Sequence, residues 1–173
     1  MMRHKGTVAA LSVLIALGVV VAPSAHADDW ALNGKYQATS NGDWAATNDV
    51  YRNEASVRSI WTISMTCINV LTCRGTVTSD IGWSAEITTT NMEYRVKREL
   101  PNWEPCADGS GRTVTGHQLY RFFPVGDGGS VLPGSRVFGG FDQTKGQSGG
   151  CISNDVLQIE LPFRLEKLDE SAE

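Results

Sequence analysis

The feature that most constrains the fold is an alternation of apolar and polar side chains with a period of two residues. In the segment 60–66, Trp61, Ile63 and Met65 fall on one face and serine and threonine on the other, and the segment 156–165 repeats the pattern. Such alternation is typical of strands with one buried face. Segments of this kind predict seven or eight strands, at residues 32–40, 60–66, 73–79, 83–88, 93–99, 117–125, 136–141 and 156–165.

Glycine and proline separate these segments, and no long stretch has the 3.6-residue apolar period of a helix. The expected fold is therefore all-β: a single antiparallel barrel or sandwich. Pro162 has no N–H, so the last strand is expected to lie at an edge or to bend there. One weak helical turn is expected at 48–56, and the glycine-rich stretches 102–116, 126–134 and 139–150 are expected to be loops.

The first 27 residues have the composition of an export signal. Basic residues precede an apolar run at 7–22, and Ala25-His26-Ala27 supplies a cleavage site of small residues. The alternative is a retained membrane anchor, but the run is shorter than the roughly 20 residues that span a bilayer, and Pro23 follows it at once. We expect a signal peptide at 1–27, one domain at 28–165, a mobile acidic tail at 166–173 and no membrane span after cleavage.

The charge of the mature chain argues against nucleic acid as a partner. Removing Arg3 and Lys5 leaves 15 − 2 = 13 basic against 19 acidic side chains, a net charge of 13 − 19 = −6 with histidine neutral. Phosphate backbones require clustered lysine and arginine. Nucleic acid is therefore not expected, and export makes an envelope or extracellular ligand or protein the expected partner.

All four cysteines follow the leader, where an oxidising compartment would pair them. Cys67 ends one expected strand and Cys73 begins the next, which favours a disulfide across a hairpin; Cys106 and Cys151 then pair by elimination. Four cysteines allow three connectivities, so the assignment is a preference. A zinc site would need paired C-x-x-C spacing or accompanying histidines, so no metal or other cofactor is expected.

Two residues offer chemistry without forming a consistent catalytic set. Ser148 lies in a G-x-S-x-G string at 146–150, but the helix and the later histidine of a nucleophile elbow are missing. His117 is the sole histidine after the leader, and a His117–Asp142–Ser148 order is too compact for a two-barrel protease. The sequence therefore predicts no catalytic residue, with an envelope hydrolase using His117 with Ser148 or an acidic residue as the alternative.

Two of the five tryptophans are candidates for contact with a ligand or partner. Trp61 and Trp83 lie on the apolar faces of expected strands and are assigned to the core. Trp44 and Trp103 lie in loop-like contexts, where aromatic side chains supply rigid contact area at low entropic cost. The alternative is that they cap the ends of the barrel.

Several strings carry a resemblance that spans most of the mature chain: the segments 33–45, 61–67, 73–85, 101–106 and 148–151. Together they resemble a group of small secreted mycobacterial proteins of uncharacterised function. The Trp-Thr-x-x-x-x-Cys segment that begins at Trp61, with the Cys-x-Gly-x-Val segment that begins at Cys73, is the most distinctive part. The resemblance implies a secreted or envelope setting and transfers no catalytic residue.

The leading hypothesis is therefore a secreted or cell-envelope protein that acts as a non-enzymatic binding module. It is motivated by a disulfide-linked β scaffold with glycine-rich loops and spare aromatic side chains, because loop clusters and barrel mouths commonly carry binding sites.

Overall fold

The computed structural model describes residues 30–69, 71–151 and 156–169. The expected leader, 1–27, and the last four residues of the expected acidic tail lie outside these ranges. Eight long strands form one antiparallel sheet in the order β1-β4-β5-β6-β7-β8-β9-β10. Pairing of β1 with β10, from Tyr36↔Lys167 to Ser40↔Phe163, closes this sheet into a barrel. The all-β prediction is confirmed, and the barrel is the correct alternative.

The barrel strands and their bounds are β1 (Asn33–Ser40), β4 (Val57–Asn69), β5 (Thr72–Ser79), β6 (Trp83–Thr90), β7 (Glu93–Pro105), β8 (Thr113–Pro124), β9 (Val137–Gly146) and β10 (Gln158–Lys167). All eight expected strands are present. The expected loop at 139–150 is wrong over 139–146, because β9 pairs with β8 and β10 as far as Gly146 and Lys145, respectively. Likewise, β7 and β8 occupy both ends of the expected loop at 102–116.

A short hairpin of β2 (Ala46–Thr47) and β3 (Val50–Tyr51) is added to β10 through the pair Ile159↔Thr47. The helical turn expected at 48–56 is therefore wrong. Asn48 and Asp49 form the tip of the hairpin with φ of 47° and 65°, a left-handed conformation that asparagine and aspartate tolerate. Two 3-10 turns complete the described elements: η2 (Gly42–Trp44) and η3 (Asp127–Gly129).

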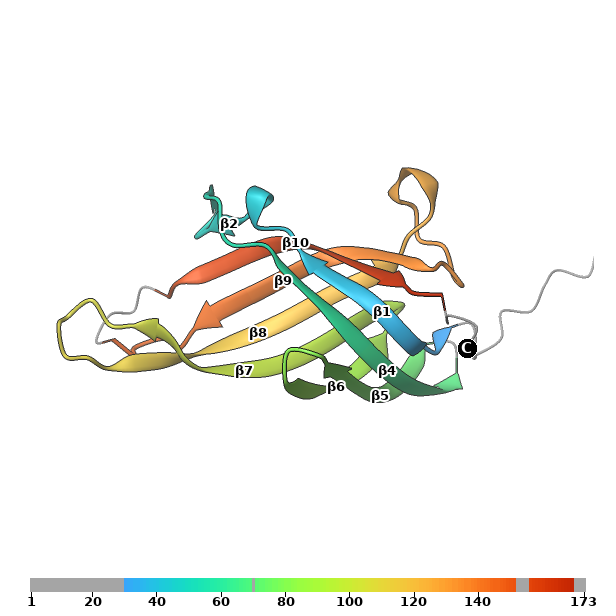
Figure 1. Cartoon of the computed structure of the whole chain (residues 1–173), viewed down its shortest axis with the longest axis horizontal. Coiled ribbons are helices and arrows are strands. Elements are labelled where there is room, and N and C mark those ends of the chain that lie inside the picture. The colour runs from blue at the N-terminus through green and yellow to red at the C-terminus, as the bar shows by residue number, and fades with distance from the viewer. Residues whose placement is uncertain (1–29, 70, 152–155, 170–173) are drawn as a thin grey trace, which may run out of the picture.

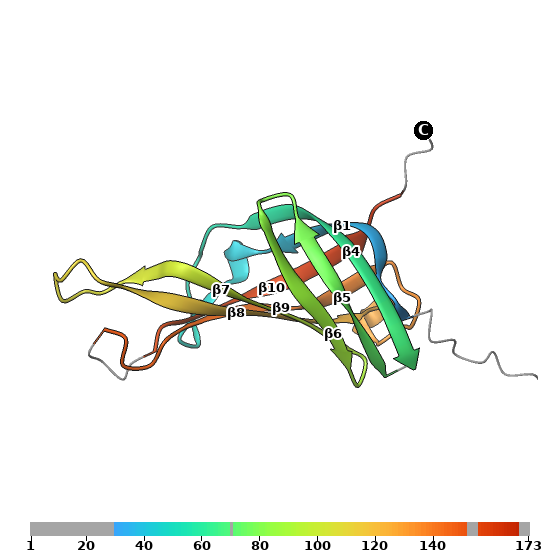
Figure 2. The same cartoon turned by 90° about the horizontal axis from the view of Figure 1, so that it is seen from below.

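The barrel is elongated, and one end carries a long projection. The strands β6 and β7 pair only from Ile87↔Val96 to Thr90↔Glu93, so β7 continues with β8 alone. Figures 1 and 2 show the β7–β8 hairpin extending past the body of the barrel, with β4, β5 and β6 crossing the other strands at a steep angle. The β2–β3 hairpin lies beside β10 (Figure 1).

Aromatic side chains fill the interior. The Trp61 ring lies 4.9 Å from that of Tyr120 and 5.3 Å from that of Phe163, and Tyr94 stacks on Phe122 at 5.4 Å. Trp61 is thus a core residue as predicted. The other buried members of this core include Tyr36, Ile63, Met65, Val77, Ile87, Val96, Phe138 and Leu165.

Both expected disulfides are present. Cys67–Cys73 joins the neighbouring strands β4 and β5, and Cys106–Cys151 joins the tip of the β7–β8 hairpin to the segment that follows β9.

Two further findings concern the residues after β10 and the length of the helices. The Leu168 N–H donates to Lys35 O at 2.9 Å, so ordered pairing passes the expected start of the acidic tail. Within the described ranges, no helix has the length and apolarity needed to cross a membrane.

Candidate functional site

Three large aromatic side chains are exposed together on the outside of the barrel. Trp44, Tyr51 and Phe141 are 65%, 80% and 45% exposed and surround one depression of about 360 Å³ next to Pro162. We call these three side chains the aromatic surface. The carboxylates of Asp49 and Glu160 lie at the same depression, which gives its rim a negative charge.

Trp44 is held by a tight turn. The Asn41 side chain accepts the Asp43 N–H at 3.1 Å and caps η2, while Gly42 O accepts the Glu54 N–H at 3.0 Å. A Cβ at Gly42 would lie 2.0 Å from Glu54 O, so only glycine allows this close approach of two backbone segments. The exposed indole therefore projects from an ordered turn.

Tyr51 and Phe141 are positioned by the sheet. Asn48 closes the β2–β3 hairpin onto β10, because its N–H donates to Gln158 O at 2.9 Å and its side chain accepts the Gln158 N–H at 2.8 Å. Phe141 lies on β9 opposite Pro162 of β10. The expectation that the last strand lies at an edge is wrong, because β10 pairs with β9 on one side and with β2 and β1 on the other. Pro162 itself lies in the gap between the end of the β10–β2 pairs at Glu160 and the start of the β10–β1 pairs at Phe163.

A buried carboxylate lies directly behind the aromatic surface. Asp142 follows Phe141, points inward and is 3% exposed. It accepts a hydrogen bond from Ser40 Oγ at 2.7 Å and one from Gln118 Nε2 at 2.6 Å. Burial raises the pKa of this carboxyl above its ordinary value, and the two hydrogen bonds oppose the shift. The Ser40–Asp142 hydrogen bond connects β9 to the end of β1, just before the turn that carries Trp44.

A second depression, of about 480 Å³, lies on the outer face of β8 and β9 on the other side of Phe141. We call it the β8–β9 groove. Its apolar walls are Phe123, Val125, Val131 and Phe141, and the charged residues in its lining are Arg121 and Glu93. Nothing in the sequence pattern identified this groove, because its residues come from three strands (β7, β8 and β9) and the loop after β8.

The two tryptophans predicted to contact a ligand lie in different places. Trp44 belongs to the aromatic surface, while Trp103 lies in the irregular part of β7 between Leu100 and Glu104. A Cβ at Gly116 would lie 2.7 Å from Trp103 Cγ, and one at Gly146 would lie 3.5 Å from Trp103 Cζ3. The half-buried Trp103 ring thus packs over two glycines at the base of the projection.

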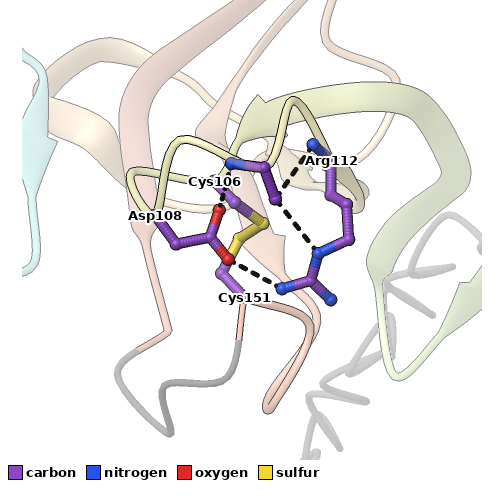
Figure 3. A network of polar contacts seen from close by, with 5 residues as sticks. Cys106, Asp108, Arg112 and Cys151 are labelled. Atoms are coloured by element: carbon purple, nitrogen blue, oxygen red, sulfur yellow. Dashed lines mark hydrogen bonds and ion pairs between the residues drawn. A yellow bond between two sulfur atoms is a disulfide. The ribbon is translucent and has the colours of Figure 1, made fainter.

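The end of the projection is ordered by a small polar network (Figure 3). Arg112 Nη2 donates to Asp108 Oδ2 at 2.8 Å, and the Ser110 N–H donates to Asp108 Oδ1 at 3.0 Å. Hydrogen bonding from the Ser110 side chain, from Arg112 and from the Ser110 backbone holds the pKa of the Asp108 carboxyl well below its usual range. Together with the Cys106–Cys151 disulfide, they give the exposed tip a defined conformation.

The structure does not bring His117 together with Ser148 or Asp142. His117 is exposed on the outer face, with Nδ1 3.8 Å from Glu99 Oε1, whereas Asp142 points into the barrel. Ser148 is exposed in the turn after β9. In the part of the chain that the structure describes, His117 has no hydrogen bond to Ser148 or Asp142, and no cluster of three metal-ligating side chains was found.

A comparison with solved structures found a similar fold in the monomer form of the M. tuberculosis PknI sensor domain. The TM-score is 0.57 with 11% sequence identity, and the similarity covers 81% of this chain and 89% of that chain. At this identity, the likeness concerns the fold alone. No protein-family model and no curated protein matches the chain.

Proposed function

We propose that the protein is a non-enzymatic binding module of the cell envelope or extracellular space, and that the aromatic surface contacts its ligand or partner. The observation that carries this proposal is the exposure of Trp44, Tyr51 and Phe141 around one depression. Contiguous exposed apolar side chains commonly mark interaction sites. Tryptophan and tyrosine are also the residues most enriched among those that dominate binding energies.

The rigid placement of these side chains supports the same function. A loop that orders only on binding loses conformational entropy at that moment, whereas a preorganised surface does not. Trp44 projects from a capped turn, and Tyr51 from a hairpin fastened to β10. The filled interior also favours a binding site on the outside of the barrel, because aromatic side chains occupy the space that a central ligand would need.

The proposed location rests on the disulfides and the leader. Two disulfides with no free cysteine among the described residues fit an oxidising compartment. The similar fold is that of a domain described as a sensor, which is consistent with a role in binding. The signal peptide at 1–27 and the secreted setting implied by the sequence strings belong to the same proposal.

The test is retention of the purified protein on a mycobacterial cell-envelope preparation, measured by sedimentation. The double variant Trp44→Ser/Tyr51→Ser is expected to lose at least about tenfold in affinity, since two such side chains together contribute about 2 kcal/mol or more. The matched control is Ile68→Ser/Ile81→Ser, which changes side chains that are 87% and 57% exposed elsewhere on the barrel. Equal retention of the two double variants, or no retention of the wild type, would overturn the proposal.

A further inference from the structure

The β8–β9 groove has space at its floor because a side chain is missing there. Gly139 lies on the outer face between Phe123 of β8 and Arg164 of β10. A Cβ at this position would have only Val125 Cγ1 and Cγ2 within 4 Å, at 3.6 and 3.8 Å. The volume of about 480 Å³ falls within the range of about 300–1,000 Å³ that small-molecule sites occupy.

Apolar side chains enclose this space on several sides. Phe123 comes from β8, and Phe141 lies two residues beyond Gly139 on β9. Val125 and Val131 face each other in an isolated β-bridge that closes the loop after β8. An alkyl chain is the ligand portion that such walls remove from water most favourably.

A positive charge without a partner lies in the lining of the same groove. No described carboxylate lies within 4.0 Å of the Arg121 guanidinium. Arg95 is directly opposite Arg121 across β7 and β8, and Arg95 is paired with Glu93. Glu93 also lines the groove, but its carboxylate is paired with Arg95. The two arginines and this glutamate therefore leave one net positive charge, and like charges in directly opposed positions repel each other.

We propose that the β8–β9 groove binds an acyl chain that carries a single carboxylate. The alkyl portion lies over Gly139 between Phe123 and Phe141, and the carboxylate pairs with Arg121. The planar guanidinium matches a carboxylate in bidentate geometry, and the bound anion offsets the repulsion from Arg95. This site shares Phe141 with the aromatic surface but does not depend on that surface having a partner.

The experiment titrates the protein with decanoate, using calorimetry for affinity and backbone amide NMR shifts for location. Decanoate is expected to bind with one-to-one stoichiometry and to shift the amides of Gly139 and Phe141. The uncharged analogue 1-decanol and the short carboxylate butyrate are each expected to bind at least tenfold more weakly. Absence of decanoate binding, or equal affinity for decanoate and 1-decanol, would overturn the inference.

Two variants test the two halves of the site. Arg121→Gln removes the charge and is expected to weaken decanoate binding at least tenfold. Arg74→Gln removes an arginine charge on β5, outside the groove, and is expected to change the binding less than twofold. Gly139→Leu fills the groove and is expected to abolish binding, with thermal unfolding used to verify that the variant is folded. Decanoate affinity that survives either Arg121→Gln or Gly139→Leu unchanged contradicts the assignment.

The double variant Trp44→Ser/Tyr51→Ser separates this inference from the proposed function. It is expected to leave decanoate affinity within twofold of the wild type while reducing envelope retention. Loss of decanoate binding in this variant would contradict an independent groove. Intact envelope retention in Arg121→Gln would support the separation of the two sites.

Discussion

The inner and outer faces of β8 and β9 carry similar aromatic residues in opposite environments. Phe122 and Phe138 point inward and are 0% and 3% exposed, whereas Phe141 points outward and is 45% exposed. The inner pair packs edge to face at 6.1 Å within the filled barrel, while Phe141 lies between two surface depressions. The difference indicates that the close-packed core uses one face of these strands, whereas side chains on the other face contribute less to it.

The largest effect is expected where this difference is greatest. Phe122→Ala should reduce the free energy of unfolding by about 3–5 kcal/mol, because it removes a fully buried ring from a close-packed core. Phe141→Ala should reduce it by about 1 kcal/mol or less, since much of that ring is already in water. Urea unfolding of both variants measures the difference. Equal losses would mean that the outer face also supports the fold.

Two adjacent glycines of β9 give the next comparison. A Cβ at Gly140 would lie 1.9 Å from Arg121 O, a backbone atom, whereas one at Gly139 would be in ordinary contact with Val125. Gly140→Ala is therefore expected to destabilise the protein by about 1–3 kcal/mol through overpacking. Gly139→Ala should be close to neutral in the same thermal melts, and a large loss in this variant would show that the groove floor is more crowded than the structure indicates.

A smaller, pH-dependent effect is expected at Asp142, the inward neighbour of Phe141. Burial raises the pKa of this carboxyl in the folded state above its value in the unfolded chain. Its contribution to stability is therefore present below the ordinary carboxyl pKa and is lost as the pH rises through the raised value. Asp142→Asn has no such titration, because an amide remains neutral.

The measurement is the urea midpoint of the wild type and Asp142→Asn from pH 7 down to pH 4. The stability of the variant relative to the wild type is expected to be greatest at pH 7 and to decrease as the pH falls. Taking the difference between the two proteins cancels the contribution of the other carboxyls, including Asp108, whose pKa is shifted in the opposite direction. A difference that stays constant over this range would contradict the raised pKa.

Local sequence patterns predicted the strands and disulfides because both depend on short-range regularities. Alternation along 60–66 correctly assigned Trp61 and Ile63 to the core, and the position of Cys67 and Cys73 at the ends of adjacent strands predicted their pairing. The same reasoning ended the expected strand at 141, because the residues 142–146 resemble a polar, glycine-terminated loop. Their place in the sheet depends on pairing with β8 and β10, which no local pattern contains.

The chain by itself determined an all-β domain with two disulfides and a net negative charge, since composition and period-two alternation are properties of neighbouring residues. Tertiary structure alone decided that the sheet closes into a barrel and that the aromatic surface exists. Trp44, Tyr51 and Phe141 come from η2, β3 and β9, and they meet only because β10 pairs with both β2 and β9. Such pairing depends on which distant strands bury their apolar faces together, and the alternation within one strand does not specify its neighbours.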